Sequence, residues 1–185
     1  MKYLPAADYA RTRWKNGAGE TSQIAVFPSD ATLDDFVWRV SMATVARDGA
    51  FSRFAGIDRT LIVLAGDGVI LRLDGQEYPL LPGHAPFRFA ADRDADAVLL
   101  GDVVTDLNIM TRRGAAEHRV AWVRPGESLA ASAATVILFA TEPSTLRILG
   151  ERVALATSDA MIFGGGEQAA LETGRVLAVS IELTA

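Results

Sequence analysis

The sequence lacks cysteine altogether and contains only two histidines, His84 and His118, among its 185 residues. Without cysteine the chain has no disulfide, no thiol nucleophile and no thiolate metal ligand, as is common in a reducing cytosol. The histidines are isolated and lack the His-x-His spacing of a metal site, although a mixed carboxylate site stays open as an alternative. We therefore predict a cytoplasmic protein with no metal ion and no cofactor.

Long apolar runs and an excess of positive charge are missing as well. No stretch approaches the roughly 18 apolar residues of a membrane span, and the first residues lack the apolar core of a signal peptide. The net charge is −5 and the isoelectric point about 5.0, whereas nonspecific nucleic-acid binding requires a basic surface. We expect neither a membrane nor a nucleic-acid partner, and the sequence is compatible with a homodimer.

Familiar catalytic motifs are absent too. No Gly-x-Ser-x-Gly elbow is present, and no arrangement of serine and histidine indicates a triad. The glycines of Asn16–Gly19 do not open a predicted helix, so they indicate a turn rather than a dinucleotide-binding loop.

Short strands separated by turns dominate the sequence. Residues alternate in polarity from Phe36 to Ala43, and Asp74-Gly75 between two further runs is a strong hairpin signal. The best helix candidate, residues 127–134, is short and alanine-rich. This pattern predicts an all-β sandwich or barrel.

The chain also repeats itself at an offset of 75 residues. Leu61–Phe87 aligns without a gap on Val136–Ile162 and places Ile62 on Ile137 and Gly75 on Gly150. The repeat predicts two tandem modules, residues 1–112 and 113–185, linked near residues 112–133. The second copy lacks the unusual polar residues of the first, so we expect any site in the first module.

Those polar residues occupy alternate positions on three predicted strands: Thr21 with Gln23, Arg39 with Ser41, and Asp106 with Asn108 and Arg112. One interpretation is a solvated sheet face, which is the commoner arrangement. The other is a barrel mouth in which the three rows converge on a cavity.

The second interpretation has a chemical consequence. Lys15, Arg39 and Arg112 against Asp106 make such a cavity positive, which suits a small carboxylate, because arginine offers it two parallel donors. Alternatively, an Arg39–Asp106 pair merely ties two strands together. The sequence alone leaves both open.

The loop Asp48–Gly56 contains Phe51 and Phe54 where small polar residues are the norm. Loops of this composition often cover a site. The alternative is a surface on which the two rings dock onto a partner protein.

Four segments together resemble the HutD/Ves family: Arg13–Thr21, Trp38–Ala43, Asp48–Arg59 and Asp106–Arg113. The resemblance implies a cupin-like double-stranded β-helix duplicated into a bicupin, encoded with the operons for bacterial histidine breakdown. It also implies an accessory or regulatory protein that binds a small acidic metabolite without an established catalytic activity. Ala18 stands where the family more often has a glycine, and the usual cupin metal histidines are absent.

We therefore predict a non-metal bicupin that binds a small carboxylate ligand, such as formylglutamate, formiminoglutamate or urocanate. The alternative is a metal-free isomerase or hydrolase in which Asp106 or Glu20 acts as general base. The predicted ligand-binding residues are Trp14, Asn16, Thr21, Gln23, Trp38, Arg39, Ser41, Phe51, Phe54, Asp106, Asn108 and Arg112.

Overall fold

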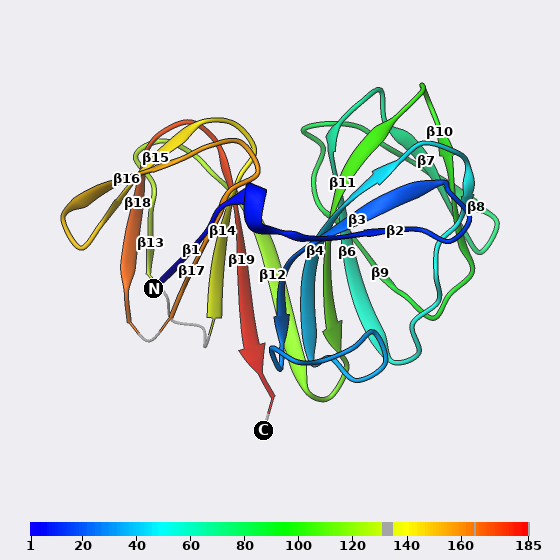
Figure 1. Cartoon of the computed structure of the whole chain (residues 1–185), viewed down its shortest axis with the longest axis horizontal. Coiled ribbons are helices and arrows are strands. Elements are labelled where there is room, and N and C mark those ends of the chain that lie inside the picture. Colours follow the sequence, from blue (N-terminus) through cyan, green and yellow to red (C-terminus); the bar gives the residue numbers. More distant parts are fainter. Residues whose placement is uncertain (131–134, 165, 185) are drawn as a thin grey trace. The chain divides into compact units, whose positions relative to one another are not determined.

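The computed structural model describes residues 1–130, 135–164 and 166–184, which form two compact units (Figure 1). One unit consists of residues 10–115, and the other of residues 1–9 together with 116–185. The regular secondary structure of the described residues is β-strand except for one 3-10 turn, η1 (Ala6–Asp8), and these residues contain no α-helix. None of their helices could cross a membrane. The predicted all-β class is confirmed.

The unit of residues 10–115 is built from two antiparallel sheets. The six-stranded sheet has the order β2-β3-β4-β11-β6-β9, formed by Ala10–Arg13, Gly19–Phe27, Trp38–Val45, Val104–Arg112, Ile57–Ala65 and Phe87–Ala90. The four-stranded sheet has the order β5-β10-β7-β8, formed by Gly49–Ala50, Ala95–Leu99, Val69–Leu73 and Gln76–Leu80.

The inner faces of these two sheets share one apolar core. Leu61 and Val63 of β6 cluster with Val69 and Leu71 of β7, and Phe89 of β9 belongs to the same cluster. A second cluster contains Phe36, Ile57, Ala91 and Met110, with Phe54 packed against it. Because strand side chains alternate between faces, the residues in phase with Leu61 and Val63 point into this barrel.

The other unit repeats this arrangement with different strands. Its five-stranded sheet has the order β1-β17-β14-β19-β12, formed by Lys2–Leu4, Ala160–Phe163, Thr135–Ala140, Val176–Leu183 and Ala116–Val123. Its four-stranded sheet has the order β13-β18-β15-β16, formed by Ser128–Ala130, Gln168–Thr173, Ser144–Ile148 and Glu151–Leu155. The apolar core of this unit includes Val136, Leu138, Leu146 and Ala178.

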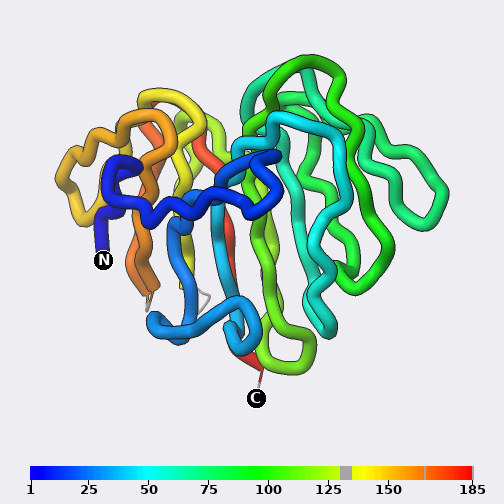
Figure 2. The backbone as a smooth tube through the Cα atoms, turned by 45° about the vertical axis from the view of Figure 1, so that its right-hand side comes forward, coloured from blue at the N-terminus to red at the C-terminus, as the bar shows by residue number. Residues whose placement is uncertain are grey.

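The backbone confirms the duplication that the sequence predicts. Hairpin β7–β8 turns at Asp74 and Gly75 with φ of 49° and 79°, and hairpin β15–β16 turns 75 positions later, at Leu149 and Gly150, with φ of 51° and 86°. Figure 2 shows each hairpin projecting from its own unit, around residue 75 and around residue 150 on the colour bar. Two consecutive left-handed residues form the tight turn that twisted antiparallel strands require.

Three details differ from the sequence-based expectations. Strand β1 pairs with β17, so residues 1–9 belong to the unit of 116–185 and not to the module predicted for 1–112. Strands β12 and β13 occupy half of the link predicted at 112–133. The predicted helix at 127–134 is wrong at Ser128–Ala130, which pair with β18, because pairing outweighs the weak helix preference of so short a segment; residues 131–134 lie outside the described residues.

Candidate functional site

The polar rows lie inside the barrel of residues 10–115. Across neighbouring strands the register sets Gln23 beside Ser41, Ser41 beside Asn108, and Asn108 beside Leu61 of the apolar core. Ser41 and Asn108 are only 2% and 4% exposed. Since directly paired residues point to the same face, these side chains belong to the barrel interior and not to a solvated face.

The most deeply buried cation in the barrel is Arg59 of β6, which our sequence analysis does not include among the site residues. Its Nε donates to Asn108 Oδ1 at 2.8 Å, and its Nη2 donates to the same oxygen. Asn108 Nδ2 in turn donates to Asp106 Oδ1 at 2.5 Å. Arg59, Asn108 and Asp106 thus form one buried chain of hydrogen bonds, in which the asparagine amide separates the two charges.

Arg39 of β4 is the second guanidinium inside the barrel. Its Nε donates to Gln23 Oε1 at 3.0 Å and its Nη1 donates to Ser41 Oγ at 3.1 Å. Desolvation lowers the pKa of Arg39 below its ordinary value, and no described carboxylate forms an ion pair with it. Arg39 is therefore a half-buried cation whose hydrogen-bond partners are neutral groups alone.

Burial disfavours the charged forms of both Arg59 and Asp106, so their pKa values shift in opposite directions. Desolvation lowers the pKa of Arg59 to about 10, while the Asp106 carboxylate opposes this shift. Desolvation raises the pKa of Asp106 to about 6, although Arg59 and the Asn108 amide favour its charged form. With two guanidinium groups against one weakened acid, the interior is net positive, as the sequence predicts, but Arg59 takes the place that we assigned to Arg112.

Trp14, Asn16 and Thr21 stand together at one end of the barrel. Trp14 Nε1 donates to Thr21 Oγ1 at 2.8 Å, and the Asn16 side chain accepts from the Ala18 amide at 3.0 Å. A hollow of about 30 Å³ lies here. Its lining includes Trp14, Asn16, Arg47, Asp48, Phe51 and Ala97.

The two aromatic residues of the 48–56 loop have different neighbours. The Phe51 ring lies 4.2 Å from the Arg59 guanidinium carbon and lines the hollow, so it covers the buried cation. Phe54 packs edge-on against Phe36 at 6.2 Å in the second apolar cluster. Both rings are half-buried, which disfavours the alternative of a docking surface for a partner.

Three residues named in the sequence analysis lie apart from this cluster. Trp38 stacks on Phe27 and, as the neighbour of Arg39 in β4, points to the opposite face. Arg112 donates to the carbonyl oxygens of Phe36 and Asp34 at the far end of β11. Glu20 pairs with Thr44, outside the row of Thr21, Ala43 and Asp106, so it lies on the other face from Asp106.

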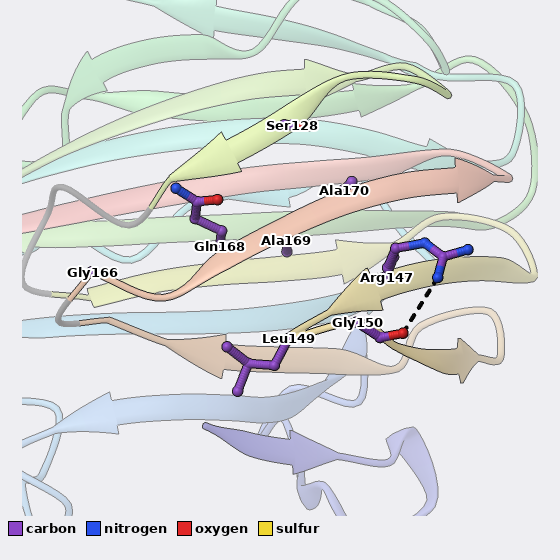
Figure 3. Close-up of a pocket in the computed structure, with 8 residues that line it drawn as sticks. All are labelled: Ser128, Arg147, Leu149, Gly150, Gly166, Gln168, Ala169 and Ala170. Carbon is purple, nitrogen blue, oxygen red and sulfur yellow. Dashed lines mark hydrogen bonds between the residues drawn. The ribbon is translucent and has the colours of Figure 1, made fainter.

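A larger hollow of about 360 Å³ lies in the other unit (Figure 3). It is lined by Arg147, Leu149, Gly150 and neighbours in β13 and β18. Arg147 bonds the Gly150 carbonyl and forms an ion pair with Glu172, and the Leu149 side chain is largely exposed. Since its cation already has a partner, we consider this open hollow a weaker ligand site than the barrel of residues 10–115.

Metal ligands do not converge in the described part of the chain, where no three histidine, aspartate or glutamate side chains are grouped for one ion. His118 is buried at 2% exposure within β12, in contrast to the charged linker that we predicted around it.

Each of the two units is a barrel of two facing antiparallel sheets, and the second barrel repeats the first. This arrangement makes the protein a bicupin. A family model described as HutD matches residues 6–179, so the chain belongs to the HutD family.

Curated relatives and a solved structure agree with this assignment. The chain is 41% identical over 141 residues to an uncharacterized 21.2 kDa protein in the hutC 3′ region of Pseudomonas putida, covering 76% of this chain and 73% of that one. It is 40% identical over 121 residues to protein Ves of Citrobacter koseri, covering 65% and 62%. HutD from Pseudomonas fluorescens SBW25 superposes with a TM-score of 0.87 at 29% identity, covering 100% and 99%.

Proposed function

We propose that this bicupin binds a small organic acid inside the barrel of residues 10–115 and acts as an accessory or regulatory protein of histidine degradation. One observation carries the proposal: Arg39 is a half-buried cation whose hydrogen-bond partners, Gln23 and Ser41, are both neutral. A buried charge without a counter-ion is costly, and a bound carboxylate would remove that cost. The resident acid, Asp106, bonds Asn108 instead.

The surrounding groups suit a carboxylate ligand. A guanidinium presents parallel N–H donors to the two carboxylate oxygens, and the Ser41 hydroxyl and Gln23 amide lie where further polar groups of a ligand need partners. Asn108 Oδ1 accepts from both Nε and Nη2 of Arg59, as a carboxylate oxygen does. A carboxylate oxygen of the ligand would take the place of Asn108 Oδ1, so that Arg59 binds the ligand together with Arg39.

The link to histidine degradation rests on the relatives. One lies in the hutC 3′ region and another is named HutD, so formylglutamate, formiminoglutamate and urocanate are our first ligands to test. A cytoplasmic location is part of the proposal, because a chain without cysteine suits a reducing compartment.

Calorimetric titration of these acids into wild type, Arg39→Gln and Arg72→Gln tests the proposal. Arg72 is the matched control, an exposed arginine of the same unit that already pairs with Glu77. Losing a buried charge-assisted contact should weaken binding at least about tenfold in Arg39→Gln. Arg72→Gln should bind like wild type. The proposal is wrong if none of the acids binds, or if Arg39→Gln binds them as tightly as wild type.

A metal-free enzyme is the second candidate, favoured by one observation. The buried Asp106 has a pKa raised to about 6, close to the range in which a carboxylate exchanges protons at neutral pH. Product formation from the same acids, followed by NMR, should then disappear in Asp106→Asn while the ligand still binds. Unchanged acids after long incubation with wild type would rule this candidate out for those compounds.

A further inference from the structure

We infer that the outer face of the four-stranded sheet of residues 116–185 is the interface of a homodimer, in which Leu149 of each copy enters the larger hollow of the other copy (Figure 3). This interface lies in the unit that the proposed function does not use, so the dimer forms with or without a bound acid. It gives a defined surface to the homodimer that the sequence allows.

Leu149 occupies a turn position that rarely holds an exposed apolar side chain. It begins the turn of hairpin β15–β16 with φ of 51°, and the residue is 73% exposed. Bulky residues rarely adopt this left-handed conformation, whereas aspartate, asparagine and glycine adopt it readily. The other copy has Asp74 at this position, ion-paired with Arg93. A single exposed leucine is common on protein surfaces, but one in such backbone indicates a use.

The hollow beside Leu149 has a size and a lining that can accept this side chain. Its volume is about 360 Å³, which is room for a leucine side chain together with part of the turn that carries it. Figure 3 shows Leu149 at its edge, directed away from Arg147. Small lining residues let the backbone of another molecule come close, and they are Ser128, Gly150, Gly166, Ala169 and Ala170.

The residues around the hollow form part of the outer face of the sheet. Leu146 of β15 and Leu171 of β18 belong to the apolar core, so their neighbours Arg147 and Ala170 point outward. Strand pairing sets Arg147 beside Ala170, and Ala170 beside Ser128. Arg147 and Ser128 are exposed and Ala170 is half-buried. A second molecule can therefore reach this row.

A two-fold axis suits a face that carries both halves of a contact. In an isologous dimer each copy uses the same surface, so a projecting side chain needs a matching hollow on that surface of its partner. Leu149 lines the edge of its own hollow. One axis beside this edge therefore seats both Leu149 side chains at once.

The charges around the turn favour the approach of two copies. Two arginines, Arg147 and Arg152, stand with two acids, Glu151 and Glu172. Glu172 forms an ion pair with each arginine, at 2.7 Å from Arg152 Nε. The face is thus close to neutral, although the chain as a whole has a net charge of −5. Repulsion between copies is therefore small at this surface.

Leu149→Asp tests the side chain that projects. Aspartate is the residue of the other copy at this position and fits the left-handed turn, so the variant should fold, which circular dichroism checks. Sedimentation velocity over a dilution series should show a wild-type dimer and a dissociation constant at least about thirtyfold higher in Leu149→Asp, because two buried leucines leave the interface. Leu33→Asp, at a 53% exposed leucine of the other unit, should dimerise like wild type.

Ala170→Gln tests the hollow that receives it. The longer side chain points outward into the hollow and occupies the space of the partner's Leu149, so this variant should also dissociate, by at least about tenfold. The inference is wrong if wild type is a monomer throughout the series, which would leave the hollow to a different occupant. It is equally wrong if either Leu149→Asp or Ala170→Gln dimerises like wild type, because the dimer would then use another surface.

Discussion

The two barrels share one strand plan, but only one has a polar interior. Through strand pairing, Asp106 lies beside Val63, and Ala178 lies beside Leu138, the residue 75 positions after Val63. Asn108 likewise pairs with Leu61, and Ser180 pairs with Val136, the residue 75 positions after Leu61. Ser180 therefore corresponds to Asn108. The copy at 116–185 thus has alanine and serine where the copy at 10–115 has an acid and an amide.

This difference bears on the ligand site that we propose. Burying arginine and aspartate side chains costs several kcal/mol per ion, and apolar replacements are often neutral or stabilising. The C-terminal copy has Ala178 and Ser180 at the positions of Asp106 and Asn108, so the strand plan does not require an acid and an amide there. This difference supports the proposed ligand site in the barrel of residues 10–115.

The strongest way to break this comparison is to place an acid in the apolar barrel. Ala178→Asp introduces a carboxylate at a site 4% exposed, in a core cluster of apolar residues. We expect a loss of about 3–5 kcal/mol in the free energy of unfolding at pH 7, measured by urea denaturation. Ala121→Asp, at the exposed alanine paired with Ala178, should cost less than about 0.5 kcal/mol. Equal, small losses would show that this barrel tolerates charge.

Asp106→Asn tests the charged group of the polar barrel through the pH dependence of stability. The folded-state pKa of Asp106 is about 6, above its ordinary 3.8, so its ionisation destabilises the fold as the pH rises from about 4 through 6. The wild type should lose about 2–3 kcal/mol relative to the variant over this interval. Urea denaturation at pH 4.5 and pH 7.5 measures the difference. A gap between the two proteins that does not change with pH would contradict an elevated Asp106 pKa.

The smallest expected effect concerns the ring that covers Arg59. Phe51→Leu keeps an apolar side chain but removes the aromatic ring whose centroid lies 4.2 Å from the guanidinium carbon, so we expect a loss of about 0.5–1 kcal/mol in unfolding free energy beyond that of the control. Thermal denaturation provides the measurement. Phe54→Leu is the control, since its ring contacts Phe36 and not a cation. A change no larger than the control would mean that Phe51 acts only as apolar cover.

Local sequence patterns predicted much of the architecture. The turn signal at Asp74-Gly75 and the offset of 75 residues identified the hairpins and the duplication, because turn chemistry and core periodicity are local properties. The same period of two placed Thr21, Gln23, Ser41 and Asn108 in rows that the pairing sets side by side.

Other site residues were missed or misplaced for identifiable reasons. Arg59 is in phase with Leu61 and Val63 in β6, and a charge within an apolar row was an overlooked signal of a buried polar group. Trp38 neighbours Arg39 in one strand, so alternation itself excludes it from the same face. Arg112 has the correct phase, but it lies at the end of β11, where backbone carbonyl groups bind it.

The amino-acid sequence was sufficient to establish strands, turns, the repeat and the membership of polar rows, since each depends on neighbours along the chain. Pairing between distant strands decided that these rows face the barrel core, that Arg59 joins Asn108 and Asp106, and that Arg39 has only neutral partners. The hydrogen bond between Arg59 and Asn108, for example, connects residues 49 positions apart. Sheet order and register bring them together, and no local pattern encodes either.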